Sequence, residues 1–170
     1  PTSIDDVRSL QLEAKAAYRQ LNVDLAQQLL DDAHEKFFTL DNAHQHRALL
    51  VELLLARAEL ALTVGNGDNA DRDLQLAARL RGGAEPLHPG LYAPNLVAAD
   101  ARVRANEETL ALGLVVVRQR EVARTSPPAS TVTLWVDGVA QPLPDAGRLT
   151  LPHGEHWLTL LSSKGGQVHR

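Results

Sequence analysis

The sequence contains no cysteine and few aromatic residues, and it has no long uninterrupted apolar run. Without cysteine the chain can form no disulfide bond and has no thiolate chemistry. The longest apolar stretch, residues 48–64, is interrupted by Glu52, Arg57 and Glu59, so we expect no membrane-spanning segment in this chain. Aromatic residues make up 4% of the sequence, so the core must consist mainly of Leu, Ala and Val. Such a core favours closely packed helices over a large β-sandwich.

The sequence also lacks an excess of basic residues. Its 170 residues carry a formal net charge of −4, and the surplus of acidic residues falls in the part that ends at Ala111. Nucleic-acid phosphates are bound through clustered Lys and Arg side chains, so we expect no nucleic-acid partner. The hydrophobic content of 44% is nevertheless sufficient for a folded core.

Helical periodicity dominates the first two thirds of the chain. Apolar residues recur at helical spacing in five successive segments, which predicts about five helices within residues 1–111. The expected boundaries are a start at Ser3, a break at Asn22, a cap at Asp41 or Asn42, a cap at Asp68 and a last helix over about residues 95–111. The third segment is apolar on most of its circumference, so neighbours should cover it on more than one side.

An internal repeat relates the first two helices to the next two. At an offset of 44 residues, the apolar positions Ala14, Ala17, Ala26, Leu30 and Ala33 reappear as Ala58, Ala61, Ala70, Leu74 and Ala77. The A-x-x-x-L-x-x-A pattern in each second helix resembles the tetratricopeptide repeat. The resemblance implies an array of helical hairpins that binds proteins, and a plain helical bundle is the alternative.

The pattern changes after Ala111, where short β-like segments replace the helical stripes. Residues 112–117 are rich in Val and have no helical stripe, which favours a first strand. Val132, Leu134 and Val136 alternate with polar residues, a turn signal follows at Asp137-Gly138, and a second alternation begins after Gly154. We therefore predict an α+β protein, with a helical domain over residues 1–111 and a small antiparallel β domain over residues 112–170.

The β segment resembles the PEGA domain, a small β module of bacterial cell-surface and envelope proteins. The resemblance rests on Leu134, Val136, Asp137, Gly138, Gly154, His156, Leu158 and Leu160. It implies an inward position for His156, and a periplasmic or outer-membrane-associated protein, with the cytoplasm as the alternative. The first residue is Pro1 rather than Met, which is compatible with removal of a signal peptide or anchor.

Two tryptophans are expected to share one face of the β unit. Alternation puts Trp135 and Thr133 opposite Leu134, and puts Trp157 and Thr159 opposite Leu158. A tryptophan is too large an apolar surface to leave in water without reason, so we expect the helices or a partner to cover this face. The four residues Thr133, Trp135, Trp157 and Thr159 are thus the candidate partner or interdomain surface.

Three functions follow as hypotheses from these patterns. The first is a non-enzymatic scaffold that binds protein partners in a bacterial envelope or secretion-associated assembly, without cofactor or metal. In the second, Trp135 or Trp157 stacks on peptidoglycan or a surface glycan. The third is a metal-dependent enzyme built on His153, Glu155 and His156, whose three-residue spacing does not place both imidazoles on one face of a strand. His44 and His46, two residues apart, are expected at the surface.

Overall fold

The fold is α+β, as predicted. A computed structural model describes residues 2–82, 85–107, 112–116, 132–142, 148–162 and 167–169. Within these residues the helices are α1 (Ile4–Arg19), α2 (Val23–Phe38), a 3₁₀ turn (Ala43–His46), α3 (Arg47–Thr63), α4 (Gly67–Leu80) and α5 (Pro94–Glu107). The strands are β1 (Leu112–Val116), β2 (Val132–Val136), β3 (Val139–Pro142), β4 (Arg148–Pro152), β5 (Leu158–Ser162) and β6 (Gln167–His169).

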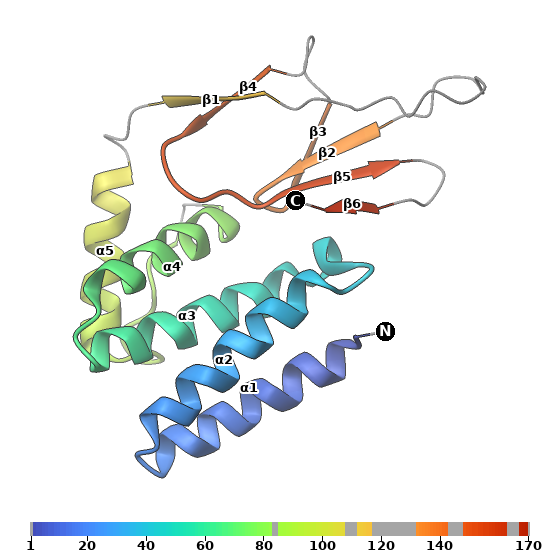
Figure 1. The fold of residues 1–170 in the computed structure, drawn as a ribbon. Helices are drawn as coiled ribbons and strands as arrows, with labels where there is room; N and C mark the ends of the chain where they lie inside the picture. The colour runs from blue at the N-terminus through green and yellow to red at the C-terminus, as the bar shows by residue number, and fades with distance from the viewer. Residues whose placement is uncertain are drawn as a thin grey trace.

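The helices pack as consecutive antiparallel neighbours. Helix α1 lies against α2, α3 against α4, and α2–α3 and α4–α5 contacts join the pairs (Figure 1). Leu and Ala side chains fill the space between them, and α3 is buried on several sides, as its apolar circumference predicts. The stripe of α4 is buried as expected at Ala70, Leu74, Ala77 and Leu80. No helix in the described part of the chain is long and apolar enough to cross a membrane.

The 44-residue repeat extends to the backbone of the two hairpin turns. Asn22 and Asn66 each cap a second helix, and each side-chain oxygen accepts a hydrogen bond from the backbone N–H three residues later. The residues before them, Leu21 and Gly65, both have a positive φ, of 61° and 80°. Glycine adopts this conformation without strain, whereas leucine does not, and Leu21 is also 86% exposed. The two hairpins therefore share one turn design, which only the second builds with glycine.

Two predicted helix caps need correction. The first helix does begin with a capping box at Ser3. Neither Asp41 nor Asn42 caps α3, however, because a 3₁₀ turn that buries Ala43 precedes it and the Asn42 side chain makes no capping hydrogen bond. Asp68 lies inside the first turn of α4, where the helix dipole favours an acidic residue, and Asn66 takes the cap. Helix α5 is described from Pro94 to Glu107, and residues 108–111 lie outside the described part.

The strands form two antiparallel groups above the helices in Figure 1. Strand β1 pairs with β4, and the other four strands follow the order β3-β2-β5-β6. The predicted strands and the Asp137-Gly138 turn are confirmed, with Val136 paired to Val139 across the turn. Both turn residues have a positive φ, of 50° and 78°, which an Asp-Gly pair tolerates in a two-residue hairpin.

Alternation divides the β unit into two faces. Leu134, Val136 and Leu151 form a second small core, and Leu149, Leu158 and Leu160 pack against it. Trp157 belongs instead to the large helical core. One face of the β unit is therefore closed by its own strands and the other by the helices.

Candidate functional site

Trp157 lies at the junction between the sheet and the helices. Its ring is 6% exposed and packs edge-on against Phe37 and Phe38 at the end of α2, with centroid distances of 5.8 and 6.4 Å. Thr159 is buried as well, at 2%. A ring this buried has no free face for a sugar, so the stacking role predicted for Trp157 is wrong.

Trp135 occupies a second contact between the same two layers. It is half-buried, and its ring lies 5.5 Å from the imidazole of His44 in the 3₁₀ turn before α3. His44 is thus a half-buried contact residue and not the surface residue that its spacing predicted. Thr133 is half-buried and alternates onto the same face as Trp135. The structure therefore places both tryptophans between the sheet and the helices, with Thr133 and Thr159 on the same face of the sheet.

Asp137 fixes the turn of β2 to the start of β5. Its backbone N–H donates to the carbonyl of Trp157 over 2.8 Å, and its Oδ1 accepts from the Trp157 N–H at 2.9 Å. Its Oδ2 lies 2.7 Å from Nδ1 of His156. One carboxylate therefore holds both the backbone and the imidazole of the neighbouring segment.

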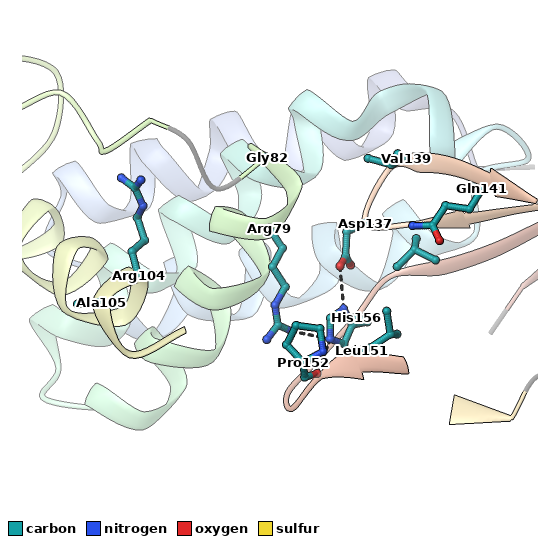
Figure 2. Close-up of a pocket in the computed structure, with 11 residues that line it drawn as sticks. Arg79, Gly82, Arg104, Ala105, Asp137, Val139, Gln141, Leu151, Pro152 and His156 are labelled. Carbon is teal, nitrogen blue, oxygen red and sulfur yellow. Dashed lines mark hydrogen bonds and ion pairs between the residues drawn. The ribbon is translucent and has the colours of Figure 1, made fainter. Parts of the chain in front are cut away.

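Arg79 of α4 binds that segment from the helical side. Figure 2 shows its side chain extending towards His156 and Pro152. Its guanidinium donates to the carbonyl oxygens of His153 at 3.0 Å and Glu155 at 2.5 Å, and Nη1 lies 3.1 Å from Nε2 of His156. We call Arg79, Asp137 and His156 the clasp, because together they attach residues 152–157 to α4.

The clasp lines a cleft of about 590 Å³ between α4, α5 and the strands. An Asp–His pair beside such a cleft could serve as an acid–base dyad. Here, however, Nε2 of His156 lies 2.8 Å from the carbonyl oxygen of Pro152 and also faces Arg79. Both ring nitrogens are therefore engaged within the protein, and no Ser, Thr, Tyr or Lys is among the described residues that line the cleft. The contacts of His156 attach its segment to Arg79 of α4 and to Asp137 in the turn after β2.

The HGEH segment does not gather its side chains. His153 and Glu155 are exposed, while His156 turns inward to Asp137. Within the described ranges, no three His, Asp or Glu side chains lie together as metal ligands would. The backbone carbonyls of His153 and Glu155 accept hydrogen bonds from Arg79, a role that side-chain spacing could not predict.

A charged cluster lies under the same loop, between α2, α3 and α4. Arg57 is 3.2 Å from Asp31 and 3.4 Å from Asp73. Burial raises the pKa of Asp73 to about 6, because loss of solvent outweighs the attraction of Arg57, and the Glu155 charge adds to the increase. Burial also lowers the pKa of nearby His34 to about 4, and the positive charge of Arg57 lowers it further.

The two shifts predict opposite effects of pH on stability. A carboxyl whose pKa rises on folding stabilises the fold at low pH, and this stability is lost as pH rises from about 4 to about 6. The stability due to neutral His34 is present above its unfolded pKa of 6.5 and is lost as pH falls towards 4. The free energy of unfolding of Asp73→Asn should therefore rise relative to that of the wild type, by roughly 1–3 kcal/mol, as pH rises from 4 to 7.

Denaturant unfolding of both proteins at several pH values measures that difference. His34→Gln is the matched variant, because its free energy of unfolding should rise relative to that of the wild type as pH falls over the same range. If the difference between Asp73→Asn and the wild type is constant with pH, Asp73 does not titrate in this window and the proposed burial effect is wrong.

A second hollow lies on the helical array, away from the sheet. Its described lining comes from three helices: Ala14, Lys15 and Tyr18 of α1, Ala26 and Leu30 of α2, and Ala56, Glu59 and Leu60 of α3. The hydroxyls of Tyr18 and Thr63 lie 3.1 Å apart at one end and bridge α1 to α3. Its volume of about 80 Å³ can hold one aliphatic side chain. Residue spacing did not identify this hollow, although the repeat places α1 and α3 in equivalent positions.

The comparisons with known proteins add no family to these observations. The resemblances to the tetratricopeptide repeat and to the PEGA domain therefore remain predictions from the residues that carry them. No protein-family model, curated protein or solved structure matches this chain.

Proposed function

We propose that this chain is a non-enzymatic protein-interaction module of a bacterial envelope or secretion-associated assembly. The observation that carries the proposal is the hollow between α1 and α3, the equivalent helices of the two hairpins. Arrays of helical hairpins bind partners along the surface that such equivalent helices form. The envelope location rests on the PEGA resemblance.

The size and lining of the hollow favour a polypeptide partner over a metabolite. Sites for small molecules typically enclose roughly 300–1,000 Å³, several times the volume of this hollow. Its apolar floor, with Lys15 and Glu59 on its walls, suits one aliphatic side chain of a segment that continues beyond it on both sides. The hollow would then be an anchor point within a longer contact.

The β unit supports this function because it is attached to the helices at several points. Trp157 is inserted into the helical core, and Arg79 binds residues 152–157 through their carbonyl groups. A partner of the helices would therefore meet a single body, and would lose less conformational freedom on binding than with a loosely tethered domain.

A peptide-display library, panned against the folded chain, tests the proposed function. We expect enriched peptides whose binding is lost when Ala56→Phe fills the hollow. Gln28→Phe is the matched control, because it adds the same ring to an exposed position of α2, about 200° around that helix from Ala26. Peptides that bind both variants equally would contradict the proposal. Sedimentation with peptidoglycan tests the glycan alternative separately.

A further inference from the structure

The outward strip of α1 combines basic charge with one exposed leucine. Arg8, Leu12, Lys15 and Arg19 are all exposed and follow one another at intervals of four, three and four residues. Residues at these intervals share one face of a helix. Leu12 is 65% exposed in the middle of this strip. We call these four residues the α1 strip.

The equivalent strip of α3 carries the opposite charge. An offset of 44 residues converts the α1 strip into Glu52, Ala56, Glu59 and Thr63, which we call the α3 strip. Glu52 and Thr63 are exposed, and Ala56 and Glu59 are half-buried. The repeat thus keeps the helical positions, while two of the three basic residues become acidic and the third becomes neutral.

The two strips meet at the hollow. Lys15 lies on its α1 side, Glu59 and Ala56 lie on its α3 side, and the Tyr18–Thr63 contact lies at one end. Helices α1 and α3 run parallel in Figure 1, so the α1 strip continues from Lys15 along one side of the hollow and the α3 strip continues from Glu59 along the other. Lys15 and Glu59 form no ion pair with each other in the described part of the chain, so both charges are available to a partner.

We propose that the surface formed by the hollow and the two strips binds an amphipathic helix of a protein partner in one direction only. The inference rests on the proposed function and adds the chemistry of the ligand. The apolar stripe of the bound helix would face the hollow. Its acidic edge would face the α1 strip, and its basic edge would face the α3 strip. Reversing a helix while its apolar stripe still faces the hollow exchanges its two edges, so the reversed helix meets like charges on both sides. Such repulsion suppresses wrong registers more than it adds affinity.

A display library of helices with a fixed apolar stripe and Glu or Lys at every edge position tests the charge pattern. Clones with all Glu on one edge and all Lys on the other should be enriched roughly tenfold over mixed clones at low salt, and the enrichment should decline as salt is raised. Equal recovery of segregated and mixed clones would overturn the inference.

Direction is measured with a photo-crosslinker at the N-terminus of one segregated peptide. It should label one end of α1 in the wild type. In the variant Arg8→Glu, Lys15→Glu, Glu52→Arg, Glu59→Lys, which preserves the net charge, it should label the other end. Labelling of both ends in the wild type would also overturn the inference. If peptides bind without charge preference and Ala56→Phe abolishes binding, only the inference fails; if no peptide binds, the proposed function fails as well.

Discussion

Replacing Trp157 with alanine should lower the free energy of unfolding by roughly 3–5 kcal/mol, the largest effect expected of any side chain at the junction. The indole is 6% exposed, belongs to the helical core and packs against Phe37 and Phe38. Its removal therefore leaves a large cavity beside these two rings. Chemical denaturation followed by circular dichroism measures the loss.

Trp135→Ala is the matched control for this prediction. Trp135 is half-buried and contacts His44, so its replacement should cost clearly less. Fluorescence gives an independent readout, because a protein with Trp157 as its single tryptophan should show blue-shifted emission that is protected from quenchers. Equal losses for the two alanine variants, together with red-shifted emission from Trp157, would mean that the helices do not cover this ring in solution.

Replacing Asp100 with alanine should cost roughly 3–5 kcal/mol, for an electrostatic reason. Asp100 is fully buried in α5, and its carboxylate forms an ion pair with Arg81 just after α4 and accepts a hydrogen bond from the Leu87 N–H. Without it, a guanidinium that is only 18% exposed loses its buried partner, and the backbone donor in the connecting loop is left unsatisfied.

The pair between Asp71 and Arg102 provides the control for Asp100. It joins α4 itself to α5, but its side chains are 40% and 55% exposed. Asp71→Ala should therefore cost only about 0–1 kcal/mol. Thermal or denaturant unfolding of both variants makes the comparison. Similar losses for the two would contradict the view that burial gives the Asp100 pair its importance.

Local patterns predicted the elements well because each depends on neighbouring residues. The helical stripes, the Ser3 cap and the Asp137-Gly138 turn follow from spacing, capping and turn chemistry over a few positions. The predicted caps at Asp41 or Asn42 and at Asp68 were wrong, because several adjacent polar residues could each cap a helix. A 3₁₀ turn precedes α3 at the first place, and Asn66 caps α4 at the second.

The contacts between the two parts of the chain could not be predicted in the same way. Alternation placed both tryptophans on one face, but it carries no information on what covers that face. In the sequence, Arg79 resembles any charged residue at the end of a helix. Its partners are backbone carbonyls, which every residue has, so the sequence does not reveal them. The hollow likewise depends on how α1, α2 and α3 meet in space.

The position of Trp157 also has a consequence for the order of folding. Its ring partners, Phe37 and Phe38, lie in the second helix, about 120 residues earlier in the sequence. The helical hairpins need only short loops to close, whereas this contact closes a very long one, and contacts between distant residues form late. Loss of a late contact mainly accelerates unfolding and leaves the folding rate nearly unchanged. We therefore expect Trp157 to act chiefly on the lifetime of the folded molecule, by slowing the separation of the sheet from the helices.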